Sequence, residues 1–222
     1  MVNNTEYFYL HVSLLLGAIL FSVLCGIFKF RTVDFPAKIL CVLLGVTFLN
    51  EITASVFAIK YHNNLSVYSI FNIVQFVLLA AYFNFAIDVF RKSNIGLYIG
   101  IAGMAVGILN IVFLEPLGNF NTNFLLFEAL CIIAMALFFF FRLLLVNDNF
   151  QLHRYPHFWF SVILVFFWSA SFLCWGLYDY YIYLKKGSKI ISYSILAINL
   201  ITYIAIGISF LSYHKMTRAD GK

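Results

Sequence analysis

Seven stretches of about 20 mostly apolar residues follow one another along the whole chain, and this repetition constrains the fold more than any other feature. An α-helix needs about 20 such residues to cross the hydrocarbon core of a bilayer. The pattern therefore predicts an all-α integral membrane protein with one domain, residues 1–222, of seven transmembrane helices. We place these helices at Tyr7–Phe28, Ala37–Ile59, Val67–Val89, Ile95–Leu114, Phe124–Leu145, Phe158–Tyr181 and Ile190–Ser212.

The composition leaves no room for a soluble domain. Hydrophobic residues make up 64% of the chain and charged residues 10%, whereas soluble domains have about 45–50% and about 25%. The longest stretch without a predicted helix runs only from Asn147 to His157. The net charge of +5 is explained by basic residues near helix ends, which contact lipid headgroups. We therefore expect the lipid bilayer, and not nucleic acid, as a partner.

Lys and Arg are distributed unevenly between the two ends of the predicted helices. Ten of the 14 lie in the odd-numbered loops and the C-terminal tail, and four lie in the other loops. Cytoplasmic loops of membrane proteins carry the excess of Lys and Arg, so we predict an outer N-terminus and a cytoplasmic C-terminus. A chain of this size and composition is typical of prokaryotic multi-pass proteins, and we expect it in the inner (cytoplasmic) membrane.

Two patterns bear on how the helices pack. Four glycines at spacings of four, three and four residues share one face of the fourth predicted helix, and they are Gly96, Gly100, Gly103 and Gly107. Small residues in such a stripe let helices approach closely, so we predict a packing seam, with a homodimer through this face as a second use. Short sequence echoes, such as Phe35-Pro36 and Tyr155-Pro156 at an offset of 120 residues, suggest a 3+1+3 repeat, although chance also explains them.

The polar residues inside the predicted helices lie mainly toward their outer ends. Glu51 is the most notable, because an ionisable group within a span costs a few kcal/mol and is usually functional. It lies eight residues before the predicted end of its helix, about 12 Å below the outer surface. By helical spacing, Asn72, Gln75 and Asn199 fall near the same depth.

We therefore predict an outward-facing polar pocket with Glu51 at its centre and Glu128 as a candidate partner. Aromatic residues of the sixth predicted helix, Trp168 and Trp175, face the same way and are candidate walls. The predicted ligand-binding residues are Glu51, Asn72, Gln75, Glu128, Asn199, Trp175, Asp179 and His11. The competing interpretation is that such amides and hydroxyls only form hydrogen bonds between helices, each worth about 0.6–2 kcal/mol.

The motifs predict no metal, no cofactor and no catalytic residue. No lysine lies in the interior of a predicted helix, which excludes an opsin-like Schiff base with retinal, and there is neither an HExxH nor a GxSxG motif. His153 and His157 have HxxxH spacing, but the intervening Pro156 makes a metal pair a poor interpretation. For these histidines we expect contact with lipid headgroups.

Three functions remain open from the sequence. The first is a carrier for a small polar or weakly basic solute, with Glu51 supplying charge or a proton. The second is a ligand-binding sensor that signals to a separate cytoplasmic protein, for which the tail His214–Lys222 offers a docking segment. The third is an intramembrane enzyme acting on lipid, with Glu51 and Glu128 as acid and base; the absence of a nucleophile or metal motif counts against it.

Overall fold

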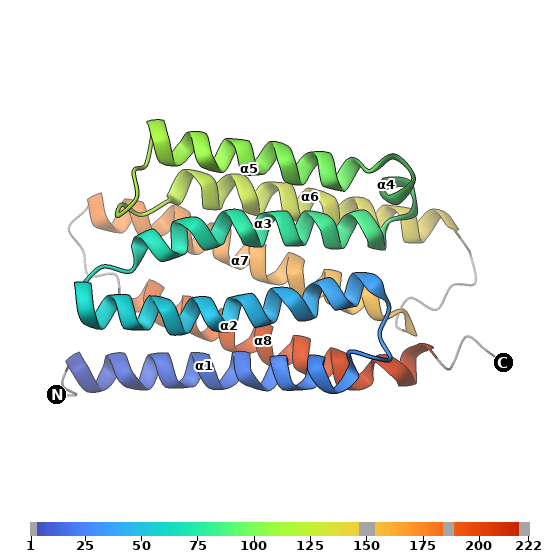
Figure 1. Cartoon of the computed structure of the whole chain (residues 1–222), viewed down its shortest axis with the longest axis horizontal. Helices are drawn as coiled ribbons and strands as arrows, with labels where there is room; N and C mark the ends of the chain where they lie inside the picture. Colours follow the sequence, from blue (N-terminus) through green and yellow to red (C-terminus); the bar gives the residue numbers. More distant parts are fainter. Residues whose placement is uncertain (1–3, 147–153, 184–188, 218–222) are drawn as a thin grey trace.

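The computed structural model describes residues 4–146, 154–183 and 189–217, which form eight α-helices and no strand (Figure 1). The helices are α1 (Asn4–Lys29), α2 (Phe35–Tyr61), α3 (Leu65–Ala86), α4 (Asp88–Ser93), α5 (Ile95–Phe113), α6 (Thr122–Val146), α7 (Pro156–Tyr183) and α8 (Lys189–Thr217). All except α4 are long and apolar enough to cross a membrane. The chain is thus a seven-span helical membrane protein, and the seven predicted helices are confirmed.

The short helix α4 was not predicted. The third apolar run was expected to continue to Val89, but α3 ends at Ala86, because the backbone of Ile87 is extended, with φ −107° and ψ 114°. A six-residue helix then begins at Asp88, and Asn94 ends it in the left-handed conformation, with φ 55°. Apolar residues stand on both sides of this break, and the single charged residue there, Asp88, was included in the predicted span.

Prolines and a capping residue fix where two of the spans begin. Asp34 caps the N-terminus of α2, and its carboxylate accepts a hydrogen bond of 3.1 Å from the backbone N–H of Ala37. Pro36 lies in the first turn of α2, and α7 begins at Pro156. Proline is favoured there because its missing N–H would have no helical partner in the first turn.

Six of the spans form a closed ring. Going around it, α1, α2, α3, α6, α7 and α8 each pack against the next, and α8 returns to α1. Helix α5 stands outside this ring, against α3 and to a lesser extent α6, as Figure 1 shows at the top of the view. The linker helix of the predicted 3+1+3 plan is therefore the one that stands apart, while the internal repeat itself stays a prediction.

The glycine stripe of α5 faces α3 of the same chain. All four glycines are buried, and a Cβ at Gly96 would lie 2.6 Å from Cβ of Asn84, while one at Gly103 would lie 1.9 Å from the ring of Phe76. Only hydrogen fits at these positions, so the predicted packing seam has an intramolecular partner. A dimer through the same face would have to displace α3.

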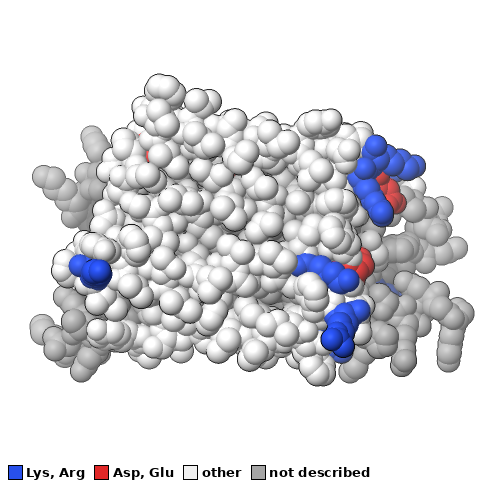
Figure 2. All heavy atoms as spheres, viewed as in Figure 1, with Lys and Arg blue, Asp and Glu red and all other residues white. Residues whose placement is uncertain are grey.

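Charged residues gather toward the ends of the bundle. Helix α1 begins at one end, here called the N-terminal end, and α8 ends at the other, the C-terminal end (Figure 1). In the view of Figure 2 most Lys and Arg side chains lie at the C-terminal end, and the surface between the ends is free of charge. Large apolar side chains such as Leu24, Tyr98 and Leu173 are exposed along the spans, as expected of a surface that faces lipid.

Candidate functional site

A cavity of about 280 Å³ lies inside the ring near the N-terminal end. Residues from all six ring helices line it, together with the loop between α5 and α6, whereas α5 contributes none. Six of the eight predicted ligand-binding residues are among the lining residues, and they are His11, Glu51, Asn72, Gln75, Trp175 and Asn199. Their roles as ligand contacts stay predictions.

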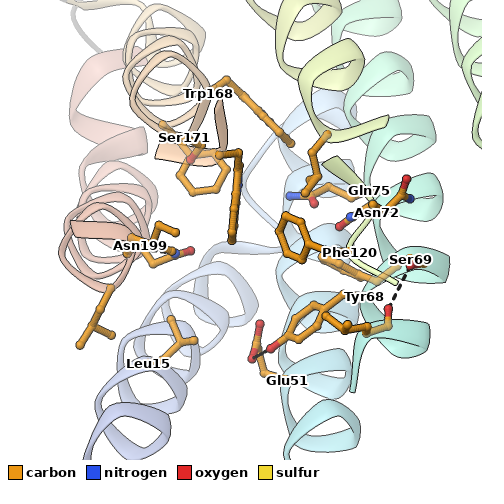
Figure 3. Close-up of a pocket in the computed structure, with 18 of the residues that line it drawn as sticks. Leu15, Glu51, Tyr68, Ser69, Asn72, Gln75, Phe120, Trp168, Ser171 and Asn199 are labelled. Atoms are coloured by element: carbon orange, nitrogen blue, oxygen red, sulfur yellow. Dashed lines mark hydrogen bonds between the residues drawn. The ribbon is translucent and has the colours of Figure 1, made fainter. Parts of the chain in front are cut away.

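The acidic group of the cavity is Glu51, ten residues before the end of α2 and so about 15 Å along the helix from that end. Its side chain is half-buried, and the carboxylate accepts a hydrogen bond of 2.9 Å from the hydroxyl of Tyr68 on α3 (Figure 3). Among the described residues that line the cavity there is no Lys or Arg, and His11 is the one basic side chain. The cavity thus offers a carboxylate, which suits a ligand that brings a positive charge.

Amide side chains from opposite sides of the ring add neutral donors and acceptors. Asn72 and Gln75 belong to α3 and Asn199 to α8. The amide nitrogen of Asn199 donates to the backbone carbonyl of Ile195 at 2.8 Å, a bond that leaves the side-chain oxygen of Asn199 as an acceptor. Such groups orient a ligand by hydrogen bonds and do not fix its charge.

Aromatic rings form the remaining wall. Phe120, from the loop between α5 and α6, packs against Trp175 with ring centroids 4.7 Å apart and against Tyr178 at 5.3 Å. Figure 3 shows Phe120 projecting between the helices toward the centre of the cavity. Phe120 could not be predicted as a wall of the cavity, because a residue outside a helix has no periodicity that indicates the direction of its side chain.

The loop that carries Phe120 is tied to its neighbours. The carboxylate of Glu115 accepts hydrogen bonds from the side chain of Asn110 at 2.8 Å and from the backbone N–H of Asn123 at 3.2 Å. Asn110 also donates to the side chain of Asn121, and Asn63 donates to the carbonyl of Gly118 at 3.4 Å. Phe120 is thus held over the cavity by a fixed loop.

The other two predicted ligand-binding residues are Glu128 and Asp179. Glu128 lies in α6 and is completely buried, but it is not among the residues that line the cavity. Asp179 belongs to α7, and its side chain lies outside the described part of the chain. Trp168, which the sequence offered as a candidate wall, lines the cavity with Ser171 from the next turn of α7.

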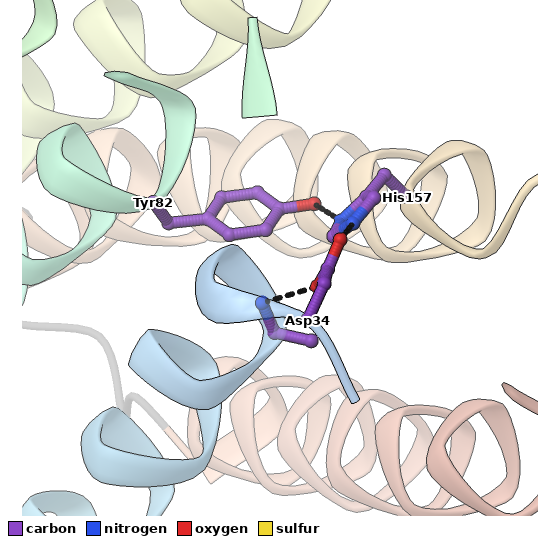
Figure 4. Close-up of polar contacts among 4 residues, drawn as sticks. Asp34, Tyr82 and His157 are labelled. Carbon is purple, nitrogen blue, oxygen red and sulfur yellow. Dashed lines mark hydrogen bonds and ion pairs between the residues drawn. The ribbon is translucent and has the colours of Figure 1, made fainter. Parts of the chain in front are cut away.

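A second polar cluster lies at the C-terminal end (Figure 4). His157, in the first turn of α7, has its Nε2 atom 2.7 Å from Oδ2 of Asp34 and its Nδ1 atom 3.3 Å from the hydroxyl of Tyr82 on α3. His157 is only 1% exposed, so the expected contact with lipid headgroups is wrong for this residue. His153 lies outside the described residues.

Asp34 is the acid of this cluster. Partial burial by itself would raise the pKa of its carboxyl, but the hydrogen bond and charge of His157, with smaller contributions from the hydroxyl of Tyr213 and the backbone N–H of Ala37, outweigh burial and lower it. The nearby ring of Tyr155 shows the opposite effect, since burial and the charges of Asp34 and Asp88 raise its pKa to about 12. The C-terminal end is thus closed by a carboxylate paired with a buried histidine.

Comparison with known protein families, with curated proteins and with solved structures finds no match for the chain. The cavity and the Asp34–His157 cluster are therefore the features that bear on its function.

Proposed function

We propose that the protein is a membrane carrier that binds a small polar solute with a basic group in the cavity at the N-terminal end. The observation that carries the proposal is the position of Glu51, an acid inside a cavity to which every helix of the ring contributes. A cationic amine would pair with this carboxylate and lie against aromatic rings, an arrangement that stabilises cations by about 0.5–2 kcal/mol per ring.

The placement of the cavity within one half of the bundle supports transport by alternating access. The interior of the ring toward the C-terminal end is filled by buried side chains such as Phe160, Leu164 and Phe210, and beyond them the Asp34–His157 pair joins α2 to α7. In this proposal the solute reaches the cavity from the N-terminal end, past the loop that carries Phe120, and the C-terminal end is the closed side. A carrier would open the second side only after the first has closed around the solute.

The orientation in the membrane is part of the same proposal. We place the N-terminal end outside and the C-terminal end in the cytoplasm of a prokaryotic inner membrane, in keeping with the excess of Lys and Arg toward the C-terminal end. The solute would then enter the cavity from outside.

The first test is ligand binding to the purified protein in detergent. Thermal unfolding of the wild type is followed with a panel of small amines, amino acids and neutral polyols, and the same panel is repeated with Glu51→Gln. An amine should raise the midpoint of the wild type, and the variant should bind it about 10-fold to 100-fold more weakly, because a hydrogen bond to a charged group contributes about 1.5–3 kcal/mol.

The second test separates a carrier from a sensor. Protein in liposomes should accumulate the labelled amine without any other protein, and Glu51→Gln should abolish that accumulation. The packed interior below the cavity also fits a sensor that passes a helix shift to a separate cytoplasmic protein. Specific binding of the amine without uptake, together with a partner that co-purifies only when the tail His214–Lys222 is present, would replace the carrier by the sensor.

A further inference from the structure

Glu128 is a buried acid that the cavity does not use. Its side chain is 0% exposed, and among the described residues neither carboxylate oxygen has a hydrogen-bond partner. By contrast, Glu51 receives a hydrogen bond from Tyr68. A buried carboxylate that is ionised and unpaired is very costly, so this position requires a ligand, and the smallest ligand that removes the charge is a proton.

Ring contacts fix the position of Glu128 relative to the cavity. On the antiparallel pair α6 and α7, Phe139 packs against Tyr155 and Phe140 against Phe158, with centroids 6.2 and 5.6 Å apart. Twelve residues before Phe140 on α6 is Glu128, and twelve residues after Phe158 on α7 is position 170. Glu128 is therefore level with Trp168 and Ser171, which line the cavity. Leu125, one turn before Glu128 on α6, lines the cavity as well.

Glu128 therefore lies at the level of cavity-lining residues of α7, and one turn beyond Leu125, which lines the cavity on its own helix. Trp168 is 2% exposed, and its indole N–H also has no partner among the described residues. The register places this unpaired donor at the level of the unpaired acid. A buried acid at this level is thus close to the cavity without being one of its lining residues.

No other titratable group on the neighbouring helices competes for this position. The helices packed against α6 are α3, α5 and α7. On α3 the stretch between Tyr68 and Tyr82 contains no titratable residue, α5 carries no acidic or basic residue, and on α7 there is none between His157 and Cys174. On α6 itself, Cys131 lies one turn further and interacts electrostatically with Glu128. Among the described residues of α3, α5, α6 and α7, Glu128 is thus the one carboxylic acid at this level.

Resting on the proposed carrier function, we propose that Glu128 is the binding site of a coupling proton. The carboxylate takes one proton from water in the cavity, forming an O–H bond and becoming neutral, and it gives the same proton back to water when it is next exposed. Trp168 lies at the level of Glu128 on the neighbouring helix and lines the cavity, so we place the exchange path beside it.

The first experiment does not depend on transport. Infrared spectra of the purified protein in membranes should contain the carbonyl stretch of a protonated carboxylic acid, and the band should shift in D₂O because the proton exchanges. Glu51→Gln serves as the control for the second acid within the spans, and Asp88→Asn for an exposed acid of α4. Glu128→Gln should remove a part of the band that both of these variants keep. A wild type without the band, or a band that Glu128→Gln leaves unchanged in intensity, overturns the proposal.

The second experiment tests coupling in liposomes. A proton gradient should accelerate uptake of the labelled amine by the wild type, and Glu128→Gln, checked for a thermal midpoint like that of the wild type, should lose the acceleration. Acceleration that persists in Glu128→Gln overturns the proton site and leaves the carrier intact. Failure of the wild type to bind or take up any amine overturns the carrier function, and the infrared result still decides whether Glu128 holds an exchangeable proton.

Discussion

Oδ2 of Asp34 lies 2.7 Å from Nε2 of His157, although 123 residues separate them in the chain. The contact joins the N-terminal cap of α2 to the first turn of α7 at the C-terminal end of the ring. Tyr82 on α3 extends the cluster to a third helix. His157 is buried and Asp34 is 47% exposed, so Asp34 is the member of the pair that is accessible from outside the bundle.

This contact predicts how stability depends on pH. The pKa of Asp34 is lower in the folded protein, so the pair contributes stability above the ordinary range of an Asp carboxyl, about 3.9. That contribution is lost as the pH falls through the lowered pKa of the folded state. The thermal midpoint in detergent should therefore fall on acidification, and it should fall less steeply in Asp34→Asn. Equal slopes in both proteins would contradict this role.

Removing the hydroxyl of Tyr82 should destabilise the closed end slightly. Tyr82→Phe keeps the buried ring and its packing on Phe83 but deletes the hydrogen bond to His157. The loss should be about 0.5–1.5 kcal/mol, the usual net value of one hydrogen bond, measured as a lowered thermal midpoint. Tyr98→Phe is the matched control, because Tyr98 is 67% exposed on the lipid-facing side of α5 and its change should leave the midpoint where it was.

The seam between α3 and α5 should not accept a methyl group. Gly103→Ala would place a Cβ 1.9 Å from the ring of Phe76, which is 0% exposed and has no free space to move into. Overpacking of this kind costs about 1–3 kcal/mol, so the thermal midpoint should drop. In Gly17→Ala the new Cβ meets nothing within 4 Å, and the midpoint should stay level or rise. A variant of Gly103 as stable as that of Gly17 would show that the seam is looser than described.

Phe120 should matter for the ligand and little for the fold. Phe120→Ala opens the cavity beside Trp175 and removes one aromatic face, so amine affinity should fall about 2-fold to 30-fold, in line with about 0.5–2 kcal/mol for a cation over a ring. Phe113→Ala serves as the comparison, since Phe113 is 74% exposed at the end of α5 and lines no part of the cavity. Titration by calorimetry in detergent measures both. An unchanged affinity for Phe120→Ala would remove this residue from the binding site.

The spans and much of the cavity could be predicted because both depend on local patterns. Length and hydrophobicity place the seven helices, and helical spacing gives the depth and direction of Glu51, Asn72 and Asn199. The break after Ala86 was not predicted, because Asp88 is the only charged residue there and apolar residues resume directly after it. The burial of His157 depends on which helices are neighbours in the ring, and no periodicity encodes this order. One sequence feature did place both residues at helix starts: Asp34 lies two residues before Pro36 in the first turn of α2, and His157 follows Pro156 at the start of α7.

The position of α5 outside the ring has a consequence for how relatives of this protein should differ. One face of this helix must keep its four glycines to fit α3, while its other residues touch neither the cavity nor the Asp34–His157 cluster. For the proposed carrier, selection on the choice of solute would act on the six ring helices and not on the outward side of α5. Among relatives with different solutes, residues on that side should therefore vary while the four glycines are kept.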